Sequence, residues 1–92
     1  NCTGLGAARL FNDSDLVPAK GQLVFLPPDP AVDDMTFGGG FFGKDGFLHL
    51  CPRGDVVVLG GIFRSNDSST NAEADQTERI VLEHQKLFES FG

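Results

Sequence analysis

The stretch from Leu48 to Gly61 constrains the fold of this chain more than any other part of its sequence. It holds two apolar runs on either side of a short link that contains Arg53 and Gly54. Two runs of β-forming residues across such a link indicate a β-hairpin. A glycine pair closes the second run, and glycines inside a strand usually mark a bulge or the close approach of another group. His49 lies between two leucines and, on a strand, points away from both of them.

The remaining sequence predicts an α+β fold with a mostly antiparallel, four-stranded sheet, one long C-terminal helix packed on a face of the sheet and a short N-terminal helix. The expected strands, joined as successive hairpins, span residues 20–26, 35–42, 47–51 and 55–63. The first strand has apolar side chains on both faces, so we expect it to lie centrally or to be covered on both sides. Residues 43–46, Gly-Lys-Asp-Gly, predict a hairpin turn. Residues 1–6 are typical of a strand end followed by a glycine turn, and residues 7–11 of a brief helix that needs a neighbour.

The long helix is predicted over residues 71–91. Thr70 and Glu73 match a capping box, in which the hydroxyl accepts from a backbone N–H and the carboxylate reaches back. Gly92 is placed to cap the other end. One stripe of the helix is expected to face the sheet, and it comprises Ile80, Val81, His84, Leu87, Phe88 and Phe91.

The charge of the chain argues against two classes of partner. The formal net charge is -6, from 7 Lys+Arg against 13 Asp+Glu. Nucleic acids and anionic membrane surfaces both attract basic patches, so we expect neither as a partner. No apolar run approaches the roughly 20 residues that a membrane-spanning helix needs, and no signal peptide is recognisable. A cytoplasmic location is favoured, although the compartment stays open. The first residue is Asn1 rather than Met, which suggests a piece of a longer protein.

Few side chains offer chemistry of their own. Cys2 and Cys51 lack the paired spacing of a zinc site and are expected to be free thiols. Neither histidine is accompanied by the nucleophile and carboxylate that a catalytic arrangement needs, so we expect no catalytic residue and no metal site. His84 is expected to be a packed, hydrogen-bonded helix residue. His49 on its strand is the better candidate for holding the carboxylate of a ligand.

Four segments, in this order, resemble the D-amino-acid oxidase family of FAD-dependent oxidoreductases. They are Asn-Cys-Thr-Gly-Leu-Gly-Ala at 1–7, Pro-Ala-Lys-Gly-Gln at 18–22, His-Leu-Cys-Pro-Arg at 49–53 and Val-Val-Leu-Gly-Gly-Ile-Phe at 57–63. The expected helix at 71–91 also falls where that family has one. The resemblance covers nearly the whole chain, and the order and spacing of the segments make it more specific than any one of them.

The resemblance implies that residues 1–92 are a single-domain fragment of a larger flavoprotein. Residues 1–15 would end its FAD-binding domain, and residues 16–92 would form part of its substrate domain. Thr3 matches a family contact to FAD, and Gly4 lies on the same turn. His49 falls where the family commonly has a Tyr that helps to hold the substrate carboxylate. An imidazole can also donate to a carboxylate, and it can carry charge near neutral pH.

The implied activity of the parent protein is oxidation of an amino acid or related amine by hydride transfer to the flavin, with oxygen as the final acceptor. The chain lacks the family's N-terminal Gly-rich segment, later Arg and C-terminal flavin loop, so alone it is expected to bind FAD weakly or not at all and to be inactive. Self-association is expected through apolar surface around Cys2, Leu5, Leu10 and Phe11. The alternative is a non-enzymatic α+β binding or interaction module.

Overall fold

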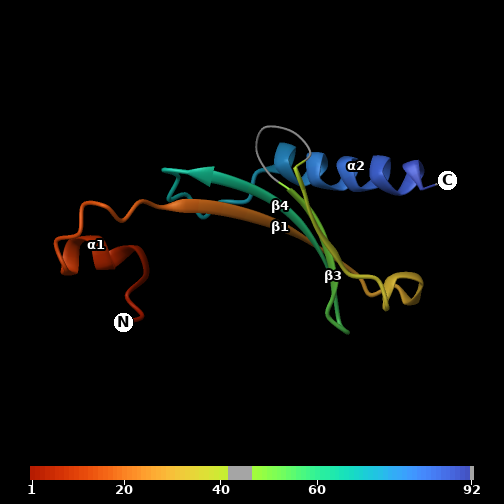
Figure 1. Ribbon diagram of the computed structural model, residues 1–92, viewed down its shortest axis with the longest axis horizontal. Helices are drawn as coiled ribbons and strands as arrows, with labels where there is room; N and C mark the ends of the chain where they lie inside the picture. Colours follow the sequence, from red (N-terminus) through yellow and green to blue (C-terminus); the bar gives the residue numbers. More distant parts are fainter. Residues whose placement is uncertain (42–46, 92) are drawn as a thin grey trace.

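The computed structural model describes residues 1–41 and 47–91. Four strands form one antiparallel sheet, and the helix α2 (Ala74–Ser90) lies across one of its faces (Figure 1). The strands are β1 (Ala19–Leu26), β2 (Phe37–Phe41), β3 (Phe47–Pro52) and β4 (Val57–Ser65). A single-turn 3₁₀ helix, η2 (Pro30–Val32), lies between β1 and β2. The predicted α+β fold is confirmed.

The order of the strands is β1-β4-β3-β2. Strands β2, β3 and β4 therefore follow one another as hairpins, but β1 pairs with β4 and lies at an edge. The predictions that all four strands form successive hairpins and that the first strand lies centrally were wrong. Leu23 and Phe25 are 49% and 64% exposed, so the apolar residues on the two faces of β1 reflect one covered face and one open face. The prolines that follow β1 cannot pair in a ladder, and the chain crosses to the far edge of the sheet before β2 begins.

The predicted central hairpin is confirmed. In the ladder between β3 and β4, Leu50 lies opposite Leu59, and both side chains are buried. The link is closed by a hydrogen bond in which Arg53 N–H donates to the Val56 carbonyl at 2.8 Å. Gly54 in this link has a φ of 83°, a left-handed conformation that glycine adopts without a steric penalty.

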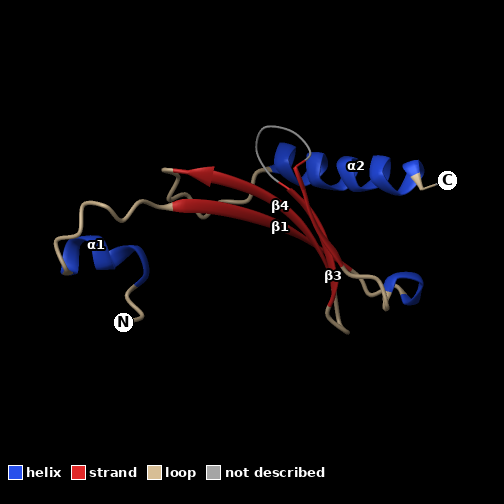
Figure 2. Ribbon diagram, viewed as in Figure 1, coloured by secondary structure: helices blue, strands red, loops and turns tan. Residues whose placement is uncertain are grey.

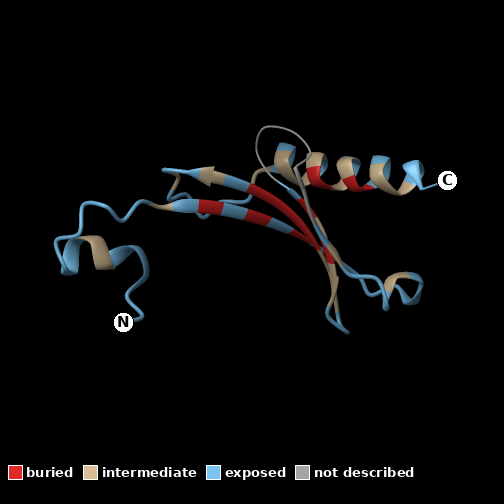
Figure 3. Cartoon of the chain, in the orientation of Figure 1, coloured by how far each residue is buried: buried red, intermediate tan, exposed pale blue. Residues whose placement is uncertain are grey.

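The hydrophobic core lies between the sheet and α2, as the buried residues in Figure 3 show. Every strand that α2 covers contributes to it, and Ile80, at 1% exposure, is its most buried side chain. Complete burial of such a side chain stabilises the folded chain by about 1.5–3 kcal/mol. The core cluster consists of Val24, Leu50, Val57, Leu59, Ile62 and Ile80.

The helix α2 begins later than predicted, with Glu73 rather than Thr70 at its N-cap position, and no side chain caps it. The Glu73 carboxylate instead accepts from Lys20 Nζ at 2.8 Å and from Arg64 at 2.9 Å. The Gln22 side chain also pairs with the main chain of Glu73, accepting from its N–H and donating to its carbonyl, both at 3.0 Å. Contacts to the sheet have therefore replaced the expected capping box.

The helix stripe is confirmed at Ile80 and His84, which are buried, but not at Phe91, which is 68% exposed because it follows the last helical residue. The Gly92 cap and the turn at 43–46 lie outside the described residues. No helix among residues 1–41 and 47–91 is long and apolar enough to cross a membrane.

The N-terminal segment extends beyond the end of the sheet (Figure 2). It contains a 3₁₀ turn, η1 (Gly4–Gly6), and the short helix α1 (Ala7–Leu10), which confirms the predicted helix. Residues 1–3 form no strand, contrary to prediction, and no other segment pairs with them in the described part of the chain. Leu5, Leu10 and Phe11 are all more than half exposed, so the predicted apolar surface is present.

Candidate functional site

The face of the sheet opposite α2, here called the open face, carries the candidate site. Residues that pair across strands point to the same face. The register places Leu23, Gly60, His49 and Gly38 in one row across all four strands. The open face is rich in exposed apolar side chains, namely Leu23, Phe25, Phe47 and Phe63.

The imidazole of His49 lies over Gly60. A Cβ added to Gly60 would overlap the ring, whereas one added to Gly38, on the other side of the row, would stay 3.5 Å from the His49 Cβ. Phe47, two residues earlier on β3, has its ring centroid 5.3 Å from that of His49 with an interplanar angle of 37°. The close approach of another group, which the glycine pair predicted, is confirmed at Gly60, and the group is the His49 ring.

Gly61 has a separate role in the sheet. The register between β1 and β4 shifts at this point, because Gln22 pairs with Ile62 while Leu23 pairs with Gly60. A Cβ on Gly61 would come within 2.8 Å of the Gln22 carbonyl oxygen. Glycine therefore accommodates an irregularity of the kind that the sequence indicated.

The ring of His49 has an unused polar atom. Its Nδ1 is buried and makes no hydrogen bond among the described residues. Burial lowers the pKa of His49 below the ordinary value of 6.5, and the charge of His84 lowers it further. The neutral ring is thus favoured at pH 7, in which one nitrogen donates and the other accepts. A buried polar atom without a partner is costly, so His49 is the unsatisfied polar group of the open face among the described residues.

His84 is buried on the other side of the sheet, as a packed, hydrogen-bonded residue, which confirms its predicted role. Its Nδ1 lies 2.7 Å from the Ile80 carbonyl oxygen within α2. Its Nε2 lies 3.1 Å from the His49 carbonyl oxygen on β3. His84 therefore joins α2 to β3 at His49, whose own side chain lies on the open face.

The candidate cofactor residues Thr3 and Gly4 are not brought near His49, because the N-terminal segment extends away from β3 (Figure 1). Thr3 is exposed, and its hydroxyl donates to Asn1 Oδ1 at 2.6 Å. Gly4 has a φ of 55°, and a Cβ added there would meet nothing within 4 Å. This turn is therefore exposed and encloses no space of its own among the described residues.

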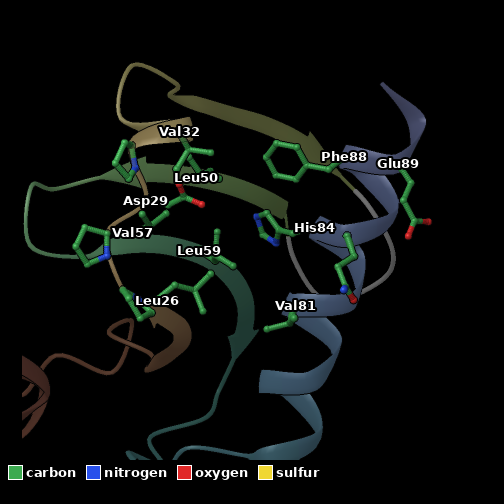
Figure 4. Close-up of a pocket in the computed structure, with 14 residues that line it drawn as sticks. Leu26, Asp29, Val32, Leu50, Val57, Leu59, Val81, His84, Phe88 and Glu89 are labelled. Atoms are coloured by element: carbon green, nitrogen blue, oxygen red, sulfur yellow. The ribbon is translucent and has the colours of Figure 1, made fainter. Parts of the chain in front are cut away.

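A groove of about 650 Å³ lies on the covered face, between α2, the sheet and the segment after β1. Figure 4 shows Leu59, Val81, His84 and Phe88 turned toward it. No sequence pattern predicted this groove, although the prolines of residues 27–30 were a signal that the chain leaves the sheet there. His49 does not line the groove, so the groove and the open face are separate features.

A polar cluster at the start of α2 was also missed. Lys20 is only 7% exposed, and its Nζ donates to Ser69 Oγ, Asn71 O and Glu73 Oε2 at 2.8–3.1 Å. The hydrogen bond from Lys20 lowers the pKa of Glu73, and Arg64 lowers it further. The alternation along β1, which turns residues 20, 22 and 24 inward, was the available signal.

The described residues also show the state of the cysteines and of possible metal ligands. Cys2 and Cys51 are free, the first exposed and the second half-buried. Within residues 1–41 and 47–91, no three His, Cys, Asp or Glu side chains gather as they would around a metal ion.

Comparison with known proteins finds relatives that are similar over most of this chain. No family model and no solved structure matches it. It is 34% identical over 83 residues to a D-amino-acid oxidase of Dictyostelium discoideum and 33% identical over 82 residues to a D-amino acid oxidase of Dugesia ryukyuensis. It is 28% identical over 81 residues to a D-aspartate oxidase of Homo sapiens. Each match covers 88% of this chain and 22% of the relative, so the chain spans about a fifth of the length of these relatives. Over most of its length, the chain is therefore similar to one segment of D-amino-acid and D-aspartate oxidases.

Proposed function

We propose that this chain is the part of an amino-acid-oxidising enzyme whose open face lines the substrate pocket. The observation that carries the proposal is the His49 ring, which lies over Gly60 with a buried, unpaired Nδ1. The relatives are named for D-amino acids and D-aspartate, so a small amino acid or related amine is the proposed substrate class.

The role of His49 in this proposal is to bind the substrate carboxylate. Its lowered pKa favours the neutral ring, which holds one N–H for donation to an anionic oxygen. Hydrogen bonds to a charged group are shorter and stronger than those between neutral groups. The glycine beneath the ring and the Phe47 ring beside it restrict the directions in which that N–H can point.

The exposed apolar side chains of the open face support a buried position for this face in the larger protein. Contiguous apolar patches are uncommon on free surfaces and usually mark a site of contact. We propose that residues 16–92 belong to the substrate domain and that residues 1–15 end an FAD-binding domain. Most contacts to the flavin, beyond Thr3 and Gly4, would come from outside this chain.

The experiment is an oxidase assay on the full gene product that carries this chain. Hydrogen peroxide production is measured with a panel of D-amino acids that includes D-aspartate, with the matching L-amino acids as controls. Stereoselective oxidation of at least one D-amino acid is expected. If no panel member is oxidised by a folded, flavin-loaded protein, the proposal is wrong and a non-enzymatic binding module becomes the better interpretation.

The isolated 92-residue chain is expected to bind little or no FAD and to be inactive, because its turn at Thr3 and Gly4 is exposed. A flavin absorbance band at a one-to-one ratio with the purified chain would contradict this expectation.

A further inference from the structure

The two histidines of the chain are connected through the sheet. The His49 side chain lies on the open face, while its carbonyl oxygen is 3.1 Å from Nε2 of His84, which belongs to α2 on the covered face. A second contact anchors the His84 ring within its own helix, since Nδ1 lies 2.7 Å from the Ile80 carbonyl oxygen. The main chain at His49 is thus held from the side opposite to its ring.

We propose that His84 is a positioning residue for His49: it fixes the β3 main chain at His49 from the covered face and keeps the His49 ring neutral over Gly60. The consequence for substrate binding rests on the proposed function. The coupling between the two rings does not, because it follows from the contacts of this chain alone.

The hydrogen-bonding pattern of His84 supports a charged ring. Both of its nitrogens face carbonyl oxygens, which only accept hydrogen bonds. A neutral imidazole carries one N–H, so only a ring with two N–H groups donates to both oxygens. A positive charge there opposes a second positive charge on His49, and His84 is the second cause, after burial, of the lowered pKa of His49.

The other groups around His84 carry no positive charge that could oppose its protonation or be opposed by it. Asp29, from the segment after β1, and Glu89, on α2, line the same groove and are acidic. Strand β4 contributes apolar Leu59, and β2 contributes Phe37, whose ring centroid lies 6.1 Å from that of His84. Among the described neighbours, His49 on β3 is therefore the group whose protonation His84 opposes.

The test uses ¹⁵N-histidine-labelled full gene product and follows the His49 ring by NMR from pH 5 to 8. Two substitutions separate the contact from the charge. His84→Gln keeps a side-chain N–H that can reach the His49 carbonyl but carries no charge, and His84→Leu has neither. Lys86→Gln is the matched control, because it removes a cation from the same helix at a position whose side chain is 70% exposed.

The pKa of His49 is expected to rise in both His84 variants and to stay unchanged in Lys86→Gln. The KM for substrate should rise about fivefold in His84→Leu, with kcat retained, because the main chain that positions His49 loses its contact with α2. His84→Gln should restore most of the lost affinity. An unchanged His49 titration in folded His84→Gln overturns the proposal, and so does equal KM in all variants of an active enzyme.

A measurement on the unsubstituted protein covers the case in which the variants do not fold. Both ring nitrogens of His84 should carry a proton in ¹⁵N spectra, and the His84 Nε2–H should exchange slowly with solvent. An unprotonated His84 nitrogen together with a rapidly exchanging Nε2–H overturns the proposal. An enzyme that oxidises no D-amino acid would refute the proposed function while leaving this coupling measurable.

Discussion

The imidazole of His49 occupies the space that a side chain on Gly60 would fill. The two residues are cross-strand partners at the centre of the sheet, in the row that also contains Gly38. The missing side chain on β4 lets the ring lie flat against the neighbouring strand, so one glycine sets the direction of the only polar side chain in the row.

Gly60→Ala is expected to displace the His49 ring and to lower the free energy of unfolding by about 1–3 kcal/mol, the usual cost of overpacking. Urea unfolding followed by circular dichroism measures it. Gly38→Ala is the matched control, because its Cβ would make an ordinary 3.5 Å contact with the His49 Cβ and should change stability much less. Equal stability of the two variants would show that the His49 ring does not rest on Gly60.

Gln22→Met is expected to destabilise the junction between β1 and α2. The Gln22 side chain bonds both main-chain groups of Glu73, and it also donates to Thr77 Oγ1 at 2.9 Å. Methionine has a similar shape without these bonds, so buried polar groups lose their partners at a cost of about 1–3 kcal/mol. Thermal unfolding measures the loss, and exposed Gln85→Met serves as a control that should leave the transition almost unchanged.

The polar cluster predicts a pH dependence of stability. The pKa of Glu73 is lowered from its ordinary value of 4.5, first by the hydrogen bond from Lys20 and then by Arg64. The unfolded chain therefore binds a proton at Glu73 more readily than the folded chain does. The contribution of ionised Glu73 to the free energy of unfolding is complete above its ordinary pKa of 4.5, and it is lost as the pH falls through the lower folded pKa.

Unfolding experiments at pH 7, 4 and 3 test this dependence. Glu73→Gln should be less stable than the unsubstituted chain at pH 7, and the difference should shrink at pH 3. Glu78→Gln, on the exposed side of α2, should lose stability with acid as the unsubstituted chain does. A difference for Glu73→Gln that stays constant with pH would contradict the account.

These elements also show how far the sequence predicts the structure. The hairpin and the contact between His49 and Gly60 depend on neighbouring strands with a short link, so local patterns were sufficient. The edge position of β1 depends on pairing between residues 19–26 and 57–65, which no local pattern encodes. The start of α2 was missed for a related reason, because Glu73 binds Lys20, which is distant in sequence.

The sequence likewise predicted only part of the candidate site. The resemblance singled out His49, and the glycine pair indicated a close approach there, but the sequence did not indicate that His84 lies behind the same residue. A helix stripe predicts which side chains face the sheet, and it leaves open which strand carbonyl each side chain meets. The positions of Thr3 and Gly4 relative to His49 depend on contacts that residues 1–41 and 47–91 do not make.

The isolated chain is expected to self-associate through its open face and its N-terminal segment. Phe25 and Phe11 are 64% and 60% exposed, and such apolar surface favours contact with another copy. Phe25→Lys should therefore shift the chain toward monomer in sedimentation experiments, while Phe91→Ser, at the exposed end of α2, should have a smaller effect. A strictly monomeric unsubstituted chain at high concentration would contradict this prediction.

The role of His49 is tested by comparing His49→Leu with the unsubstituted full gene product on two ligands. One is a D-amino acid substrate, and the other is its carboxamide, which lacks the anionic carboxylate. If His49 donates to that carboxylate, His49→Leu should raise the KM for the acid by about 10- to 100-fold, because a hydrogen bond to a charged group is lost. The KM for the carboxamide should change little. His49→Tyr, which retains a donor, should recover much of the affinity for the acid. Equal changes for acid and carboxamide, or no change for either, would contradict the assignment of His49 as the residue that binds the substrate carboxylate.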